Sequence, residues 1–295
     1  MDASATPQDS TRTTRGELLL VTGAGGQLGR AVLRAAAQRG VEAVGLTRAE
    51  LDVADADAVL AAMRSTGATA LVHCAAYTDV DGAESDRDGA FRVNEQGSRA
   101  VAEACRATGA QLVAVSTDYV FPGTAADGYA EQDATGPINV YGASKLAGEQ
   151  AIRAVLGETA CIARTAWLFS EQAPNFVQTI ARIAADRESI DVVDDQRGNP
   201  TWCGHLAEAL VTCALERIGG THHLVDGPPA TWRDLAAAVV AELELPCEVR
   251  PTTSEAFVRP AARAAVSVLR VTRSDTPAMG SWREGVHHSL LRQHA

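Results

Sequence analysis

The chain has 295 residues, of which 46% are hydrophobic and 21% are charged, and its formal net charge is -11 at pH 7. These values are typical of an ordinary globular protein and exclude disordered and fibrous classes. The acidic balance argues against a nucleic-acid surface, because phosphate backbones are bound by basic patches. No apolar run approaches the roughly 20 residues that span a bilayer. We therefore expect no nucleic-acid partner and no membrane partner.

The cysteines and the N-terminal segment indicate a reducing compartment. Six cysteines are scattered along the chain without paired spacing, which favours free thiols over a zinc site or a disulfide framework. Residues 1–16 are rich in Ser, Thr, Asp and Arg and lack the apolar core of a signal peptide. We predict a flexible N-terminal tail over 1–16 and a cytoplasmic protein. The histidine pairs at 222–223 and 287–288 lack helical ligand spacing, so we predict no metal.

The first strand leads into a glycine-rich turn. Residues 18–21 form an apolar run typical of a buried parallel strand, the turn follows at 22–29, and a helix is predicted over 27–39. Glycines in this strand-turn-helix setting let backbone N–H groups approach a pyrophosphate at the positive end of the helix. The turn therefore predicts a dinucleotide site that includes Gly23 and Gly26.

The end of the second strand bears on the choice of cofactor. This strand is predicted over 42–46 and is followed by Thr47 and Arg48. Sites that prefer NAD usually place a carboxylate here for the ribose hydroxyls, whereas an arginine accommodates a 2′-phosphate. Arg48 therefore favours NADPH, with NADH left open. The alternative interpretation of Arg48 is a solvated loop residue.

Strands and helices alternate through the first half of the chain. A helix near 55–63 precedes a strand over 70–73, and small residues at its end, Ala75 among them, would let the backbone lie against a cofactor. A helix carrying residues 91–108 leads to the strand that ends at 116–117. This alternation predicts right-handed crossovers and a parallel, doubly wound α/β sheet of the Rossmann type. The active site then belongs at the carboxyl ends of the strands.

The second half carries fewer motifs. We predict that residues 17–165 form mainly an NAD(P)-binding Rossmann domain, and that 166–295 form mainly a smaller C-terminal α/β substrate lobe. Some segments of the second part are expected to return to the first domain. Its expected elements are a strand over 161–169, helices over 175–185, 203–217 and 231–243, and a strand over 222–225. The two parts would close a site between them.

Tyr141 and Lys145 carry the proton chemistry that we expect. On a helix they share one face, so the ammonium can lower the pKa of the phenol from its usual value of about 10. A tyrosine tuned in this way is a general acid at neutral pH. Ser116 and Thr117 end a buried strand and supply hydroxyl donors within reach. The alternative is that Tyr141 and Lys145 are a solvated surface pair.

With these features in place, the chain resembles an extended short-chain dehydrogenase/reductase, and more narrowly the dTDP-4-dehydrorhamnose reductase family. The resemblance covers about residues 17 to 290 and depends on a set of short phrases rather than on one motif. These phrases are Gly26-Gln27-Leu28-Gly29, Ala75-Ala76-Tyr77-Thr78-Asp79-Val80-Asp81, Ser116-Thr117-Asp118-Tyr119-Val120-Phe121, Asn139-Val140-Tyr141-Gly142, Lys145-Leu146-Ala147-Gly148-Glu149, Arg164-Thr165-Ala166-Trp167, Asn175-Phe176, and Asp195-Gln196 followed by Pro200-Thr201.

The resemblance implies roles for particular residues. It implies catalysis by Thr117, Tyr141 and Lys145, with Ser116 as a further donor. The cofactor contacts that it implies are Gly26, Gln27, Leu28, Asp52, Val53, Ala76, Tyr77 and Thr78. Gly23, Arg48, Ala75, Tyr141 and Lys145 are expected beside them from the features described above. The substrate contacts expected with it are Thr117, Asp118, Tyr119, Trp167, Asn175, Gln196 and Arg263.

The implied activity is the NADPH-dependent reduction of the C4 ketone of a dTDP-4-keto-6-deoxyhexose by a monomer or homodimer. Two departures from the family pattern leave the hexose open. A proline is lost where this chain has the stretch 263–269, and Arg273 replaces a lysine, both in the part expected to hold the sugar nucleotide. The carboxylates that bind a metal at a dimer contact in some members cannot be located. A deoxysugar other than rhamnose therefore stays open.

Two other functions remain on the same fold. An epimerase or dehydratase would recycle a tightly held NAD, but dehydratases usually carry an Asp-Glu pair after the catalytic hydroxyl. This chain has Asp118-Tyr119 there, which argues against that chemistry. A non-catalytic regulatory subunit, as in the auxiliary subunit of methionine adenosyltransferase, is the third alternative. The presence of Thr117, Tyr141 and Lys145 argues against it.

Overall fold

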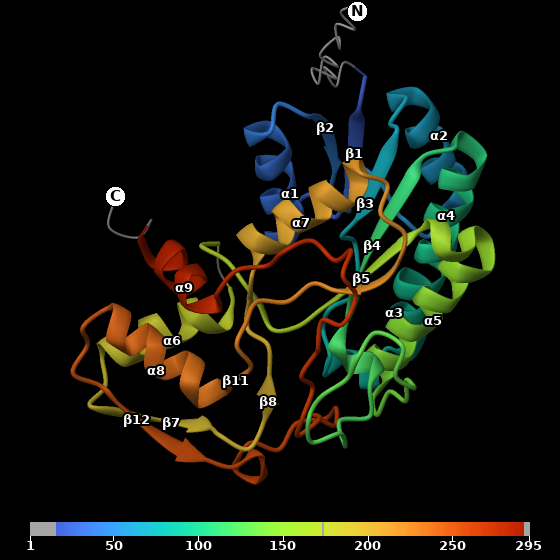
Figure 1. The fold of residues 1–295 in the computed structure, drawn as a ribbon. Helices are drawn as coiled ribbons and strands as arrows, with labels where there is room; N and C mark the ends of the chain where they lie inside the picture. Colours follow the sequence, from blue (N-terminus) through green and yellow to red (C-terminus); the bar gives the residue numbers. More distant parts are fainter. Residues whose placement is uncertain (1–15, 173, 292–295) are drawn as a thin grey trace, which may run out of the picture.

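The computed structural model describes residues 16–172 and 174–291. Apart from Gly16, the tail predicted over 1–16 lies outside the described residues. The larger layer is a six-stranded sheet in which every neighbouring pair is parallel, in the order β10-β5-β4-β3-β1-β2 (Figure 1). Its strands are β1 (Leu18–Thr22), β2 (Glu42–Leu46), β3 (Ala70–His73), β4 (Gln111–Thr117), β5 (Cys161–Thr165) and β10 (Gly220–His223).

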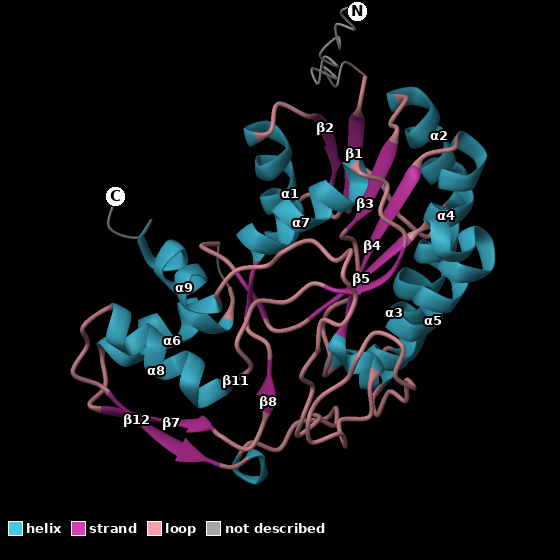
Figure 2. Cartoon of the chain, in the orientation of Figure 1, coloured by secondary structure: helices cyan, strands magenta, loops and turns pink. Residues whose placement is uncertain are grey.

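Helices cover both faces of this sheet, so the predicted doubly wound α/β fold is confirmed (Figures 1 and 2). One apolar core lies between the sheet and the first pair of helices, and a second core lies on the opposite face under the other three. The first face carries α1 (Gln27–Gln38) and α7 (Cys203–Leu215), and the second carries α2 (Ala56–Thr66), α4 (Gly97–Thr108) and α5 (Val140–Leu156).

The element boundaries follow from local chemistry. The side chains of Asp55 and Asn139 accept hydrogen bonds from backbone N–H groups of the first turns of α2 and α5, as N-caps do. Gly67 and Gly109 end α2 and α4 in the left-handed conformation that favours glycine. The helix predicted over 91–108 is interrupted: α3 (Arg87–Phe91) passes into a π-helical turn (Arg92–Gln96) before α4 begins.

Part of the C-terminal half returns to the large sheet. Helix α7 packs against α1, and β10 pairs with β5 as the edge strand. Strand β10 begins at Gly220, two residues before the predicted start at 222, and ends at His223. The other C-terminal elements form a separate apolar core. They are α6 (Phe176–Ala185), α8 (Trp232–Glu242) and α9 (Trp282–Leu291), packed with the parallel pair β7 (Ser189–Val193) and β12 (Glu248–Thr252).

Short elements connect the two layers. Four short strands pair as β6 with β9 and β8 with β11. Their bounds are β6 (Leu168–Phe169), β8 (Arg197–Gly198), β9 (Thr201–Trp202) and β11 (Ala230–Thr231).

All six cysteines are free, and five of them are buried. No helix within residues 16–172 and 174–291 is long and apolar enough to cross a membrane.

A buried ion pair joins α5 to the sheet. The guanidinium of Arg164 on β5 donates two hydrogen bonds to the carboxylate of Glu149 on α5, at 2.9 and 2.8 Å. Both side chains are only 2% exposed. Burial alone would raise the pKa of Glu149, but the hydrogen bonds and charge of Arg164 outweigh it and the pKa stays below its ordinary value. The charged pair therefore fixes the position of α5 on the sheet.

Replacing Arg164 with methionine leaves the Glu149 carboxylate buried without its main partner. We expect the free energy of unfolding, measured by urea titration, to fall by about 3–5 kcal/mol. The matched control is Arg250→Met, which breaks an exposed pair with Glu248 and is expected to cost about 1 kcal/mol or less. Equal losses in the two variants would contradict a special role for the buried pair.

Candidate active site

Four polar side chains meet where β4 ends and α5 begins. Thr117 is the last residue of β4, and Asp118 starts the 3₁₀ turn that follows it (Asp118–Val120). Tyr141 lies in the first turn of α5, and Lys145 lies one turn further along. Because the carboxyl ends of parallel strands form the binding edge of such a sheet, this cluster lies where the sequence placed it.

The single hydroxyl proton of Thr117 is already used in a hydrogen bond. Its hydroxyl donates to Asp118 Oδ1 at 3.0 Å and accepts from the backbone N–H of Tyr119 at 3.2 Å. The Thr117 hydroxyl also lowers the pKa of the nearby Tyr141 phenol, against the larger effect of burial. The ring of Tyr119 packs edge to face on the ring of Tyr141, with 5.5 Å between the ring centroids. Thr117 therefore connects the phenol to the carboxyl.

The predicted effect of Lys145 on Tyr141 is wrong in this structure. Burial raises the pKa of Tyr141 well above 10, and the hydrogen bond with Thr117 opposes only part of that rise. Lys145 donates instead to the carbonyl oxygen of Val115 at 2.8 Å. Burial lowers the pKa of Lys145 to about 8, while the charge of Glu149 works in the opposite direction. Tyr141 is consequently a protonated phenol at neutral pH, the state required of a proton donor.

Ser116 does not join this cluster, and its prediction as a second donor is not supported. Its hydroxyl donates to Glu149 Oε1 at 2.6 Å, beneath α5. The physical reason is strand geometry: successive side chains point to opposite faces, so Ser116 and Thr117 cannot serve one atom. Ser116 instead satisfies a remaining acceptor of the buried ion pair.

Asp118 is a buried carboxyl with an incomplete set of partners. It is 2% exposed, and its Oδ2 has no hydrogen-bond partner among the described residues. Burial raises its pKa to about 6, although Ser267 and Thr117 favour the charged form. Its expected role as a substrate contact is not visible here, because the carboxyl faces Thr117 and Ser267.

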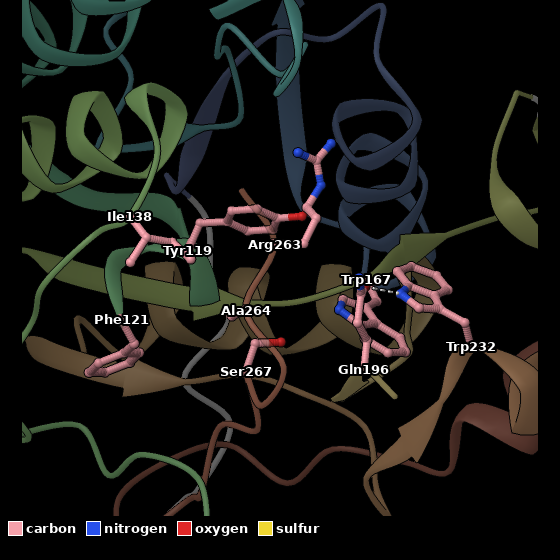
Figure 3. A pocket seen from close by; sticks show the side chains of 9 residues that line it. All are labelled: Tyr119, Phe121, Ile138, Trp167, Gln196, Trp232, Arg263, Ala264 and Ser267. Carbon is pink, nitrogen blue, oxygen red and sulfur yellow. Dashed lines mark hydrogen bonds between the residues drawn. The ribbon is translucent and has the colours of Figure 1, made fainter. Parts of the chain in front are cut away.

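A pocket opens beside this cluster (Figure 3). It brings together four of the predicted substrate residues, Tyr119, Trp167, Gln196 and Arg263, from four separate stretches of the chain. Tyr119 lies on one side and Trp167 with Gln196 on the other, with the 263–267 segment between them. The remaining lining residues are Phe121, Ile138, Trp232, Ala264 and Ser267.

Two stacked tryptophans form one wall of the pocket. The rings of Trp167 and Trp232 are nearly parallel, with centroids 3.7 Å apart. Gln196 fixes this wall, since its Oε1 accepts from Trp232 Nε1 at 3.1 Å and its Nε2 donates to Ser254 at 2.8 Å. Trp167 holds a left-handed backbone with φ of 47°, a costly conformation for a bulky residue that often marks a functional site.

Arg263 forms the other charged feature of the pocket. Its guanidinium pairs with Asp81 at 3.0 Å and lies 5.9 Å from the centre of the Tyr119 ring. Asn139 ties the same segment to the start of α5, donating to the carbonyl of Ala262 at 2.9 Å while its Oδ1 caps the helix. The loop that carries Arg263 is thus anchored to the helix that carries Tyr141.

Two other residues expected on the substrate side make contacts elsewhere in this structure. Asn175 caps α6 through its Oδ1, and its Nδ2 donates to the carbonyls of Ser170 and Gln172, so its side chain is used in a turn. Arg273 pairs with Asp275 at 2.7 Å and lies against Gly220, at the amino end of β10. That end faces away from the carboxyl edge, so the Lys-to-Arg change at 273 does not touch the pocket.

The glycine turn has the geometry of a phosphate site. Gly23 has φ of +69°, and a Cβ there would lie 2.7 Å from the backbone nitrogen of Ala75, so only glycine fits. Gly26 precedes α1 with no side-chain cap, and no acidic residue occupies the first turn. The free N–H groups and the helix dipole therefore favour an anion at this point. The side chain of Leu28 is part of the core, while Gln27 accepts from Ser170.

The other predicted cofactor residues surround this turn. Arg48 is exposed just after β2. The pKa of Asp52 is lowered mainly by the N–H of Ala54 and by Arg92, and to a smaller extent by the charge of Arg48. Val53 is buried against Gly97. The 75–78 segment follows β3, with Ala75 in contact with the turn at Gly23 and Thr78 exposed. The backbone edges of β1, β2 and β3 thus form one continuous rim.

Asn94 is a site residue that the sequence analysis missed. It lies in the π-helical turn and is 1% exposed. Its Oδ1 accepts from Tyr77 N at 2.9 Å, and its Nδ2 donates to Ser144 on α5 at 2.9 Å and to Tyr77 O. The side chain of Ala76 lies in the loop held by these bonds. A buried amide on an otherwise apolar helical face was the available signal.

Other site residues could not be found from spacing. Glu50 accepts from both the N–H and the hydroxyl of Thr47, which places a carboxylate beside Arg48. Trp232, Ser267 and Asp81 enter the site only through tertiary contacts.

No group of three potential metal ligands occurs in the part of the chain that the structure describes. His222 and His223 are hydrogen-bonded to Thr276 and to the Arg270 carbonyl, respectively.

A doubly wound parallel sheet with a glycine turn after β1, and a Thr-Tyr-Lys set at the same edge, define an extended short-chain dehydrogenase/reductase. Comparison with known proteins narrows this class. The family model described as RmlD substrate binding domain matches residues 17–294, and the chain belongs to this family.

Individual relatives agree with this assignment. The chain is 44% identical over 280 residues to a dTDP-4-dehydrorhamnose reductase of Streptomyces griseus, covering 92% of each chain. It is also 44% identical over 279 residues to a probable dTDP-4,6-dihydroxy-2-methyloxan-3-one 4-ketoreductase of Streptomyces antibioticus, covering 92% of this chain and 94% of that one. A solved dTDP-4-dehydrorhamnose reductase of Bacillus anthracis in complex with NADP superposes with a TM-score of 0.89 at 34% identity, covering 94% and 99% of the two chains.

Proposed function

We propose that this protein reduces the C4 ketone of a dTDP-4-keto-6-deoxyhexose in dTDP-sugar biosynthesis, with dTDP-4-dehydrorhamnose as the first substrate to consider. The observation that carries this is the half-buried, protonated Tyr141, which packs on Tyr119 of an aromatic pocket, in a chain 44% identical to enzymes of that activity. The enzyme is an NADPH-dependent oxidoreductase.

The chain has the features that an NADPH site requires. The N–H groups at the start of α1 would hold the pyrophosphate, and Gly23 lets it approach the sheet. Arg48 would face the 2′-phosphate, and Lys145 would hold the nicotinamide ribose near Tyr141. When bound, NADPH supplies the hydride that reduces the ketone.

Tyr141 gives the proton in this proposal. As negative charge grows on the sugar C4 oxygen, the phenol transfers its proton to that oxygen. Thr117 stands next to the phenol and donates a hydrogen bond to the same oxygen, which stabilises the charge. A raised phenol pKa keeps Tyr141 protonated before the reaction.

Lys145 acts on the cofactor side of the site in this proposal. Its ammonium is buried one helical turn from the phenol and would hold the nicotinamide ribose. Glu149, four residues further on and fixed by Arg164, favours the charged form of Lys145. The buried ion pair therefore supports both the position and the charge of Lys145.

The pocket is suited to a nucleotide sugar. Trp167 and Trp232 offer an apolar face on which a flat or weakly polar ring can pack. Arg263 brings a positive charge for the diphosphate, although Asp81 now holds it. In this proposal the segment 166–295 is mainly the substrate lobe, and it contributes these three residues to a site completed by the sheet.

The second candidate is a related deoxysugar of an antibiotic pathway. Equal identity to the Streptomyces antibioticus ketoreductase supports it. The 263–269 segment, in which the family proline is missing, forms part of the pocket wall, because Arg263, Ala264 and Ser267 line the pocket. A change of backbone there can alter which sugar substituents fit.

Substrate identity is decided by following nicotinamide absorbance with dTDP-4-keto-6-deoxyglucose, in the presence and absence of a 3,5-epimerase. We expect NADPH oxidation only when the epimerase is present, since epimerisation generates the rhamnose precursor. Oxidation without the epimerase would reassign the substrate to the non-epimerised sugar. The absence of oxidation in every mixture would contradict the proposal for this substrate pair.

Arg48→Ala tests the assignment of NADPH. We expect the KM for NADPH to rise about tenfold, because a charge-assisted bond to phosphate is worth about 1.5 kcal/mol or more, while the KM for NADH stays nearly unchanged. The control is Arg39→Ala, an exposed arginine after the far end of α1. An equal loss with both cofactors would instead place Arg48 outside the 2′-phosphate site.

A further inference from the structure

The hydrogen bonds of Thr117 are in conflict with its role in the reaction. A threonine hydroxyl has one proton and two acceptor positions. In this structure the proton goes to Asp118 Oδ1, and one acceptor position receives the Tyr119 N–H. Thr117 therefore has no proton left for a substrate oxygen.

While Asp118 is ionised, losing the hydrogen bond that Thr117 donates to its carboxylate is unfavourable. It is buried, and its Oδ2 already has no partner among the described residues. Turning the Thr117 hydroxyl toward substrate would remove another hydrogen bond from a buried charge, which is strongly unfavourable. A protonated carboxyl removes the conflict, because its O–H donates to Thr117 Oγ1 and the Thr117 proton becomes free.

We propose that Asp118 is a positioning residue whose protonation turns the Thr117 hydroxyl from Asp118 toward the reacting oxygen of the substrate. This inference rests on the proposed ketone reduction and adds to it a control of hydrogen-bond direction. When Asp118 carries a proton, Thr117 accepts from Asp118 and from Tyr119 N–H and donates to substrate. When Asp118 is ionised, Thr117 donates to Asp118, and Tyr141 serves the substrate alone. The two states differ by one proton, which Asp118 takes up from solvent or releases to it and which the reduction itself does not consume.

The surroundings of Asp118 favour its protonated form more than water does, so that the carboxyl changes its protonation state in the mildly acidic range. Burial is the largest influence and raises its pKa to about 6, whereas hydrogen bonds from Ser267 and Thr117 oppose the rise. The ionisable groups on the elements around it are Tyr119 on its own turn, Tyr141 and Lys145 on α5, Arg164 on β5 and His223 on β10 behind Phe121, and Arg263 paired with Asp81 beyond Tyr119. None of these groups forms a direct ion pair with Asp118 within the described chain.

The test is the pH profile of kcat for the full-length enzyme and its Asp118→Asn variant. In the wild type we expect kcat to fall as pH rises through the Asp118 pKa, and to level at the rate that Tyr141 supports alone. Asparagine can donate from Nδ2 to Thr117 at every pH, as the protonated acid does. The variant should therefore lose the alkaline decline and exceed the wild type at high pH by about tenfold or more, the value of one oxyanion donor.

Matched variants define the outcomes. Ser267→Ala removes a hydroxyl that lowers the pKa of Asp118, so it should move the decline to higher pH. Thr117→Val should be slow at every pH and show no decline. If Asp118→Asn keeps the wild-type decline, or is inactive at every pH, Asp118 does not control Thr117 and the inference fails.

A measurement without substrate separates this inference from the proposed function. A carboxyl whose pKa is raised on folding stabilises the folded state fully below the unfolded pKa, and that contribution is lost as pH rises through the folded pKa. The Tm of Asp118→Asn should therefore rise relative to wild type between pH 4 and pH 8, while the exposed control Asp127→Asn shows no such change. A constant Tm difference would overturn the inference even in an active enzyme. Absent reductase activity with a rising difference would overturn only the proposed function.

Discussion

The ion pair between Glu149 and Arg164 determines where the reactive side chains of this protein lie. It joins the middle of α5 to β5 in a buried region, and its carboxylate also accepts a hydrogen bond from the hydroxyl of Ser116. Because Tyr141 and Lys145 precede Glu149 on the same helix, the pair sets their height above the carboxyl edge. Losing one partner would leave a buried charge, so the site and the stability of the fold depend on one contact.

The chemistry of the site follows from how few protons its buried groups share. Tyr141 keeps its proton because burial disfavours the phenolate. Thr117 has one proton for two acceptors, and Asp118 is the acceptor that holds it when no other group competes. Lys145 is charged with help from Glu149. Each state depends on desolvation, and closure of a substrate over the pocket would strengthen every one of these interactions.

The sequence was sufficient where a feature is local. The strands predicted over 42–46 and 70–73 match β2 and β3 residue for residue, and the glycine turn predicted at 22–29 precedes α1, because each depends on neighbours in the chain. Strand alternation could also have excluded Ser116 as a partner of Thr117. The capping role of Asn175 was not foreseen, because an N-cap and a ligand contact use the same amide. The rise in the Tyr141 pKa could not be foreseen, since helical spacing to Lys145 says nothing about burial. The stack of Trp167 on Trp232 and the pair of Arg263 with Asp81 join segments far apart in sequence.

The most direct test of Tyr141 as proton donor is a single-turnover measurement on Tyr141→Phe, together with NADPH binding by fluorescence. The hydroxyl is all that changes, and the ring contact with Tyr119 is kept. We expect the rate of reduction to fall by about 100-fold or more, with NADPH affinity nearly unchanged. A rate close to that of the wild type, with cofactor bound normally, would show that another group protonates the substrate oxygen.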